Sequence, residues 1–168
     1  MAYKGGDRMI RVAICDDDKH MQESLSKYLL DYSIQCDREI DHAEFDTCEE
    51  LMDEYLKGNS FDVILLDIEF KNNDEKQMNG IELGAALRTR DDTGFLIYLT
   101  TSPDFALDSY RVDAFDYLLK PVESELFFQS LDKAYRSFSQ IMQKTVAIKT
   151  TDSIRMIPIA DIRYAERI

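Results

Sequence analysis

The chain has 168 residues, of which 45% are hydrophobic, and this length and composition suit one ordinary globular domain with a short appendage. The formal net charge of -13 repels phosphates and argues against nonspecific attraction to nucleic acid. The sequence has no apolar run of the roughly 20 residues that a membrane span needs, and its three cysteines show no paired metal spacing, which is typical of a reduced cytoplasmic protein.

The first segments alternate between strand and helix patterns. Residues 1–8 are a polar leader or a segment introduced for expression, and the apolar run 9–15 (MIRVAIC) predicts the first strand. That run ends on the acids of CDDD, the last of which, Asp18, is expected to cap a helix. The apolar positions of this helix share one face at helical spacing: Met21, Leu25, Tyr28, Leu29 and Tyr32.

The next strand and helix have weaker signals. Residues 38–45 (REIDHAEF) are a candidate strand. Asp46 and Glu49 resemble a capping box, which predicts that a helix begins at this point and ends at Gly58. The expected apolar positions of this helix are Cys48, Leu51, Met52 and Tyr55.

Three further strands follow, each with a helix behind it. The strand VILLD (63–67) is apolar until Asp67, and a helix is expected over roughly 80–90. The strand 95–101 (FLIYLTT) precedes a short helix after Pro103. The strand 114–119 (AFDYLL) precedes the clearest amphipathic helix, whose apolar positions are Phe127, Leu131, Ala134, Phe138 and Ile141.

Strands that are apolar on both faces and separated by helices predict an α/β fold, a doubly wound five-stranded parallel sheet that is covered on both sides. Ligands of such sheets bind beyond the carboxyl ends of the strands. Acids and a hydroxyl fall at these strand ends: Asp16, Asp17, Asp67 and Thr100.

The tail has a different pattern. Residues 145–149 (TVAIK) and 154–158 (IRMIP) flank the polar turn 151–153, which predicts a C-terminal β-hairpin. We expect a domain boundary near Gln143 to Thr145.

Several carboxylates at one edge of a sheet repel one another. Two unit charges about 4 Å apart cost on the order of 4 kcal/mol at an effective dielectric constant near 20. A hard divalent cation such as Mg²⁺ resolves this conflict, and Lys120, at the end of the fifth strand, can assist. A carboxylate, a Mg²⁺ site, a lysine and a threonine hydroxyl together suit phosphoryl transfer.

The motifs CDDD (15–18), VILLD (63–67), LTT (99–101) and DYLLKP (116–121) resemble, in order and spacing, the receiver domain of two-component response regulators. The resemblance covers residues 9–143 and implies a flavodoxin-like sheet with the strand order 2-1-3-4-5. It also implies a phosphoacceptor switch that assists its own phosphorylation and dephosphorylation, not an enzyme acting on other substrates.

The resemblance implies a role for seven positions. Asp67 matches the phosphoacceptor, Asp16 and Asp17 match the acidic pair that binds Mg²⁺ (with Mn²⁺ as a substitute), and the backbone carbonyl of Glu69 completes the metal site. The remaining matches are a switch hydroxyl, a switch aromatic residue and a phosphate-binding lysine, respectively Thr100, Tyr117 and Lys120. From the residues alone, Tyr117 is equally well explained as a core aromatic side chain.

Residues 100–121 and the tail IPIADIRYAER further resemble the LytR/AlgR branch of the family, in which a receiver precedes a β-rich LytTR DNA-binding domain. Residues 144–168 would be the truncated start of that domain. The implied partners are a sensor histidine kinase, a second copy of the chain bound through the face of the fourth helix, fifth strand and fifth helix, and DNA only through the missing part of the LytTR domain. No membrane partner is implied.

One loop departs from the family pattern. The family carries a proline after the phosphoacceptor and a glycine eight positions beyond it, whereas here residues 71–79 lack proline and Gly80 lies 13 positions beyond Asp67. We expect an insertion of about five residues near Asn72 to Lys76.

Two alternatives stay open at this point. The chain could be a degenerate receiver that acts as an unphosphorylated interaction module. It could also be a Mg²⁺-dependent phosphatase of the haloacid dehalogenase type, although Asp67-Ile68-Glu69-Phe70 does not fit that family's nucleophile motif.

Overall fold

The computed structural model describes residues 9–70, 77–90, 94–102, 114–143, 145–149 and 154–158, with side chains up to residue 140. The chain forms two compact units, Met1–Phe128 and Gln129–Ile168. The leader 1–8, the expected insertion at Asn72–Lys76 and the short helix expected after Pro103 lie outside the described residues.

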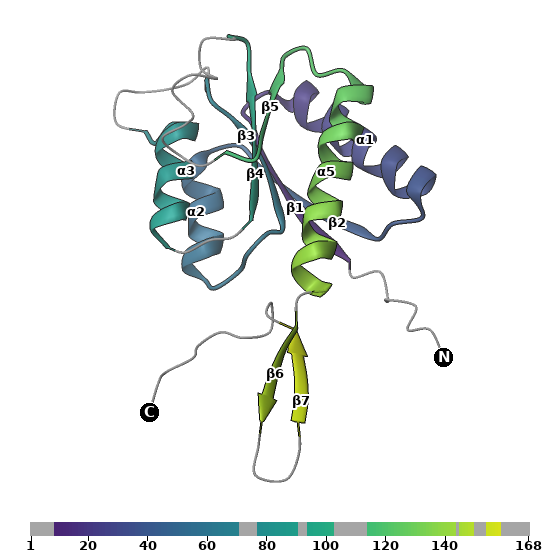
Figure 1. Cartoon of the computed structure of the whole chain (residues 1–168). Coiled ribbons are helices and arrows are strands. Elements are labelled where there is room, and N and C mark those ends of the chain that lie inside the picture. Colours follow the sequence, from purple (N-terminus) through teal and green to yellow (C-terminus); the bar gives the residue numbers. More distant parts are fainter. Residues whose placement is uncertain are drawn as a thin grey trace. The chain divides into compact units, whose positions relative to one another are not determined.

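The described strands of the first unit form one parallel sheet (Figure 1). Its order is β2-β1-β3-β4-β5, which confirms the predicted flavodoxin-like topology. Every residue of the central strand β3 is buried, and this explains its unbroken apolar run. The strands are β1 (Ile10–Cys15), β2 (Ile40–Phe45), β3 (Val63–Asp67), β4 (Phe95–Thr100) and β5 (Asp116–Leu119).

Helices cover both faces of the sheet, as predicted. Figure 1 shows α2 (Cys48–Leu56) and α3 (Gly80–Thr89) on one face. On the other face lie α1 (Lys19–Cys36) and the start of α5 (Ser124–Gln143). None of these described helices has the length and apolar content needed to cross a bilayer.

The core has two aromatic-rich halves. Beneath α2 and α3, strand residues such as Ile64 and Leu66 pack with Leu51 and Leu83 of the helices. On the opposite face, ring contacts join α1 to the first turn of α5. Their members are Tyr28, Tyr32, Phe127 and Phe128, with ring centroids 5.5 to 6.5 Å apart.

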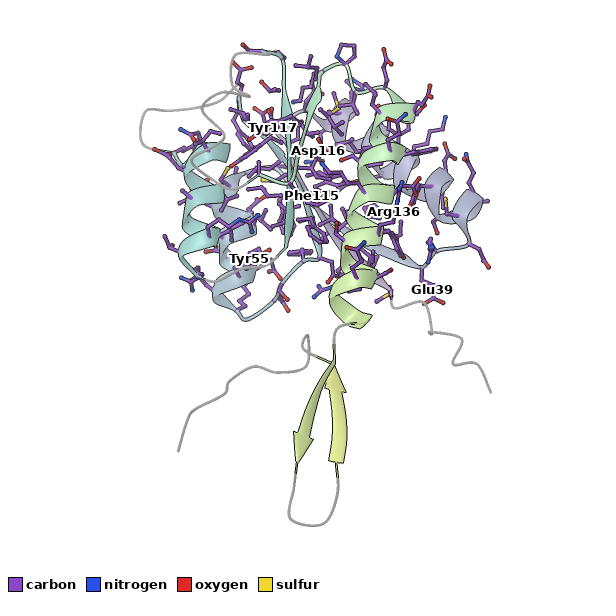
Figure 2. The ribbon with its side chains drawn as sticks, viewed as in Figure 1. Glu39, Tyr55, Phe115, Asp116, Tyr117 and Arg136 are labelled. Carbon is purple, nitrogen blue, oxygen red and sulfur yellow. The ribbon has the colours of Figure 1, made fainter. Side chains whose placement is uncertain are left out.

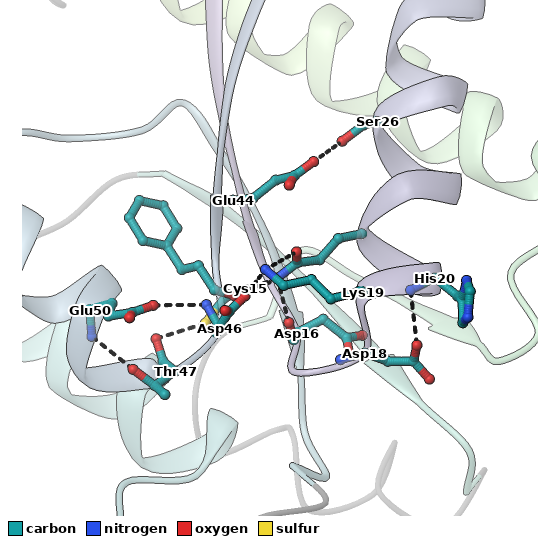
Figure 3. Close-up of polar contacts among 12 residues, drawn as sticks. Cys15, Asp16, Asp18, Lys19, His20, Ser26, Glu44, Asp46, Thr47 and Glu50 are labelled. Atoms are coloured by element: carbon teal, nitrogen blue, oxygen red, sulfur yellow. Dashed lines mark hydrogen bonds and ion pairs between the residues drawn. The ribbon is translucent and has the colours of Figure 1, made fainter.

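The start of α2 corrects one prediction. The helix is capped by Thr47, whose side chain accepts a hydrogen bond from the Glu50 amide at 3.2 Å, so the capping box predicted from Asp46 and Glu49 is wrong. The Asp46 amide instead donates to the Glu50 carboxylate at 2.9 Å. Asp46 therefore stands one residue outside the helix, and its carboxylate is free to meet α1, where it accepts from Lys19 (Figure 3).

The start of α3 lies against the end of β3. Asn79 and Glu82 form a capping box there, and the helix begins at Gly80. A Cβ at Gly80 would stand 2.0 Å from the Asp67 carbonyl oxygen. Only glycine permits this close approach, which fixes α3 beside the phosphoacceptor candidate.

The second unit contains the predicted hairpin. Strand β6 (Thr145–Lys149) pairs antiparallel with β7 (Ile154–Pro158), with Thr145 opposite Pro158. The predicted boundary near residue 144 and the assignment of 144–168 to a LytTR domain stay predictions.

Candidate phosphoacceptor and metal site

The candidate residues gather at the carboxyl edge of the sheet because all five strands are parallel. Asp16 and Asp17 follow β1, Asp67 ends β3, Thr100 ends β4 and Lys120 follows β5. Sites that are remote along the chain thus become neighbours.

A buried ion-pair cluster forms the centre of the site. Asp16 is 0% exposed and Asp67 is 2% exposed. The Lys120 Nζ lies 2.7 Å from Asp16 Oδ2 and 2.9 Å from Asp67 Oδ1, so one ammonium group bridges the two carboxylates. This pairing offsets part of their repulsion.

The electrostatics of Asp67 oppose its ionisation. Burial and the nearby charge of Asp16 raise its pKa to about 6, although the hydrogen bond and charge of Lys120 pull the other way. The Glu69 amide also donates to Asp67 Oδ1, at 3.3 Å. Burial alone would lower the pKa of Lys120, but hydrogen bonds to Asp16 and Asp67 outweigh it and raise the pKa.

The donor set fits a hard cation. One carboxylate oxygen from each of Asp16, Asp17 and Asp67 lies within 4.8 Å of the other two. Lys120 supplies a single positive charge against these three acids. Oxygen-only ligands with surplus negative charge are those that Mg²⁺ prefers. The predicted contribution of the Glu69 carbonyl stays a prediction.

The Thr100 hydroxyl forms hydrogen bonds with the backbone of Ser102, two positions further along the chain. It donates to the Ser102 carbonyl at 3.2 Å and accepts from the Ser102 amide at 3.0 Å. Its neighbour Thr101 lies outside β4, and its hydroxyl donates to the Glu69 carboxylate.

Tyr117, which is labelled in Figure 2, packs against Tyr98 of β4. Its ring stacks on Tyr98 with centroids 5.6 Å apart, and burial raises the pKa of its hydroxyl to about 12. That hydroxyl is buried without a hydrogen-bond partner among the described residues. The Tyr98 hydroxyl donates to the Gly80 carbonyl at 3.4 Å, so this pair connects β5 to the start of α3.

Two residues near the site were missed by the sequence interpretation. Gln22 is a buried polar residue that contacts the Asp16 backbone, and Tyr98 supports Tyr117. Helical spacing could have found Gln22, because it precedes Leu25 by three and Leu29 by seven positions on the buried face of α1. Nothing in the apolar run of β4 distinguishes Tyr98.

Comparison with known proteins identifies the class of this fold and site. Residues 12–132 match the response regulator receiver domain family, which is well over half of the chain. The chain therefore belongs to the receiver domain family of response regulators, as the motifs predicted.

The chain is similar to LytT sensory transduction proteins. Sensory transduction protein LytT of Bacillus anthracis is 29% identical over 171 residues, which are 93% of this chain and 65% of that protein. LytT of Enterococcus faecalis is 32% identical over 150 residues, 89% of this chain and 57% of that protein. The chain thus spans less than two thirds of the length of these relatives.

A solved structure supports the fold independently. The response regulatory domain of protein mrkE from Klebsiella pneumoniae superposes with a TM-score of 0.66 at 23% identity. The match covers 78% of this chain and 99% of that domain.

Proposed function

We propose that this receiver is phosphorylated on Asp67 by a sensor histidine kinase in a Mg²⁺-dependent reaction. One observation carries the proposal, the buried Asp67 carboxylate held 2.9 Å from Lys120 within a cluster of three acids. A nucleophilic carboxylate, a fixed cation and a metal-binding acid pair are what phosphoryl transfer requires.

Asp16, Asp17, Asp67 and the Glu69 carbonyl would hold Mg²⁺, with Mn²⁺ as a substitute. Bound there, the metal would neutralise charge on the phosphoryl oxygens. The oxygen-only donor set and the surplus of negative charge support this assignment.

In the transfer step, an Asp67 oxygen attacks phosphorus in line while the bond from phosphorus to the donor nitrogen breaks. The electron pair of that bond stays on the imidazole, which takes a proton from water. With a pKa of about 6, Asp67 is mostly ionised at neutral pH and can attack. Lys120 would stay beside the new phosphoryl group as its counter-ion.

The switch residues would respond to the added charge. The Thr100 hydroxyl would leave Ser102 and donate to a phosphoryl oxygen. Tyr117 would then move into the space that Thr100 vacates. This is a two-state element biased by a local charge.

The proposal extends to the longer protein. Residues 144–168 would begin a LytTR DNA-binding domain, and the remainder of that domain would bind DNA and regulate transcription.

Dimerisation through the face of the fourth helix, β5 and α5 is supported by two exposed apolar side chains, Leu119 (52%) and Leu126 (50%). A cytoplasmic location agrees with three free cysteines.

Incubation with acetyl phosphate and Mg²⁺ tests the proposal. Intact-mass spectrometry should find one phosphoryl group on the wild-type chain and on the control Asp53→Asn, which changes an exposed acid of α2. Asp67→Asn should remain unmodified, because the amide is a poor nucleophile. An unchanged adduct in that variant would remove Asp67 from its role.

The adduct, Mg²⁺ binding and the turnover of a phosphate ester together separate the alternatives. A degenerate receiver would give no adduct and bind no Mg²⁺. A phosphatase would release more than one equivalent of phosphate from a generic phosphate ester.

A further inference from the structure

A second polar cluster lies beside Asp16, between the start of α1 and the carboxyl end of β2 (Figure 3). Gln22 is its centre and is 0% exposed. Its Nε2 lies 2.6 Å from the Asp16 carbonyl, 2.9 Å from Asp46 Oδ1 and 3.1 Å from the Phe45 carbonyl. Its Oε1 accepts from the Lys19 ammonium at 3.1 Å.

These contacts determine which way the amide points. The opposite orientation would set Oε1 against three oxygen acceptors and the amide nitrogen against an ammonium group. Two amide hydrogens serve three acceptors, so at least one hydrogen is shared. A buried amide without such partners would carry a desolvation cost, and an apolar residue at this position would leave the Asp16 carbonyl without this donor.

The contact between Gln22 and the Asp16 backbone also affects the position of Asp17. The carbonyl that it binds belongs to the peptide group joining Asp16 to Asp17. The orientation of that peptide sets the direction in which the Asp17 side chain leaves the backbone. Asp16 itself is anchored elsewhere, because its amide donates to the Phe45 carbonyl at 3.1 Å and its carboxylate accepts from the Asp18 amide at 2.9 Å.

Holding this peptide in place opposes the electrostatic repulsion among the three acids. The carboxylates of Asp16, Asp17 and Asp67 repel one another, so a loosely held loop would let them separate. A site whose ligands are already in place binds its cation more tightly. Groups that hold the ligands, without touching the metal, typically change affinity by about 10- to 100-fold.

We propose that Gln22 is a positioning residue for the cation site, acting by fixing the Asp16–Asp17 peptide against the end of β2. This inference rests on the proposed Mg²⁺-dependent function. Gln22 touches neither the metal nor the phosphoryl group, so its removal affects cation affinity and leaves the chemistry of Asp67 intact.

The test compares Mg²⁺ binding by calorimetry in the 168-residue chain and two variants. Gln22→Met keeps the length of the side chain and removes the donor, and we expect its Mg²⁺ dissociation constant to rise about 10-fold. Leu29→Ala is the matched control, since it opens the same buried face of α1 away from the acids. It should lower the melting temperature and keep the wild-type dissociation constant.

Phosphorylation kinetics add a readout that a purely structural role would not give. With acetyl phosphate, Gln22→Met should react slowly at low Mg²⁺ and recover the wild-type rate at saturating Mg²⁺. An unchanged dissociation constant in a less stable Gln22→Met would overturn the inference. A wild-type chain that binds no Mg²⁺ would overturn the proposed function and the inference together, so the two failures are distinguishable.

A measurement on the wild-type chain covers the case in which Gln22→Met does not fold. In nuclear magnetic resonance titrations, the Gln22 side-chain amide should shift with the same Mg²⁺ dependence as the Asp17 backbone amide. The exposed Gln35 side chain should stay unchanged. A Gln22 amide that does not respond to Mg²⁺ would contradict the inference.

Discussion

Asp67 is nearly inaccessible to water, and burial raises its pKa to about 6 from the ordinary value of 3.8. The folded protein therefore binds this proton more tightly than the unfolded chain does. Ionisation of Asp67 costs folding free energy above pH 6, and this cost disappears as the pH falls from 6 toward 4. Ionised Asp67 therefore lowers the free energy of unfolding at neutral pH.

The first prediction concerns the removal of this charge. Without metal at pH 7, Asp67→Asn should raise the free energy of unfolding by on the order of 3 kcal/mol, since the pKa rises from 3.8 to about 6 and a shift of one pKa unit corresponds to about 1.4 kcal/mol. The gain should shrink by pH 4.5, where wild-type Asp67 is protonated. Urea unfolding in EDTA at both pH values measures the difference. An Asn variant that is less stable at pH 7 would contradict the assigned electrostatics.

Lys120 is the only described cation in ion-pair contact with both Asp16 and Asp67. Lys120→Met leaves the buried carboxylates of Asp16 and Asp67 without their shared counter-ion. Losing one partner of a buried pair costs about 3 to 5 kcal/mol. We expect the metal-free melting temperature to fall by roughly 10 °C, given about 2 to 4 °C per kcal/mol at this size. Added Mg²⁺ should restore more stability to the variant than to the wild type.

Differential scanning calorimetry with and without Mg²⁺ checks this second prediction. Lys57→Met is the matched control, because Lys57 pairs with Glu54 on the exposed surface, where ion pairs contribute little. An equal fall in melting temperature in the two variants would show that the buried ion pairs of Lys120 stabilise the fold no more than the exposed pair of Lys57 does.

At the scale of single residues, the sequence predicted the charged groups of the site better than the residues that hold them in place. Asp16, Asp67 and Lys120 stand at strand ends, and a parallel sheet brings such ends together whatever the packing details. Gln22 was missed because only apolar residues were assigned to the buried face of α1, although its spacing from Leu25 and Leu29 places it on that face. The hydroxyl direction of Thr100 depends on Ser102, and no sequence pattern encodes that rotamer.

At the scale of elements, α3 and β3 meet through glycine. A Cβ on Gly80 would stand 2.0 Å from the Asp67 carbonyl oxygen and 3.1 Å from the Ile68 Cα. Both neighbours are backbone atoms that cannot rotate aside. Gly80→Ala should therefore destabilise the fold by about 2 kcal/mol, within the usual range for overpacking, and weaken Mg²⁺ binding by displacing the end of β3.

Gly58→Ala is the control for this third prediction. Gly58 has φ +90° and nothing within 4 Å of its added Cβ, so alanine there introduces backbone strain without a clash. It should cost about 1 kcal/mol and leave Mg²⁺ binding unchanged. Chemical unfolding and calorimetric Mg²⁺ titration of both variants measure the contrast. Mg²⁺ affinity that is equal in both would argue against the role of the Gly80 contact.

The boundaries of elements were predicted within a few residues, and the exceptions have local causes. The strand expected at 38–45 begins at Ile40, because Asp37 with φ 52° ends α1 and directs the chain into β2. Asp46 and Thr47 are both good capping residues. Sequence alone could not choose between them, since the choice follows from the contacts of Asp46 with Lys19 and Gln22.

At the scale of the whole molecule, the alternation of apolar runs and helices was sufficient to predict a doubly wound sheet. The order β2-β1-β3-β4-β5 came from the family resemblance, because local patterns do not encode which strands are neighbours. The limits of the receiver stay a prediction that a fragment can test.

The fourth prediction is that residues 9–143 fold without the tail. The parallel sheet uses strands between Ile10 and Leu119, and every group of the proposed site lies between Asp16 and Lys120. The fragment should melt within a few degrees of the full chain and form the same acetyl-phosphate adduct. A fragment that is unfolded by circular dichroism would place part of 144–168 within the receiver.

The bridge from Lys120 to Asp16 joins residues 104 positions apart along the chain. Such a contact exists only after β1, β3 and β5 have all taken their places, because closing so long a loop is unfavourable until the intervening sheet compensates for the lost entropy. A chain in which these strands have not assembled would lack the contacts of Lys120 with Asp16 and Asp67. Under the proposed function, only completely folded copies of the chain would accept a phosphoryl group.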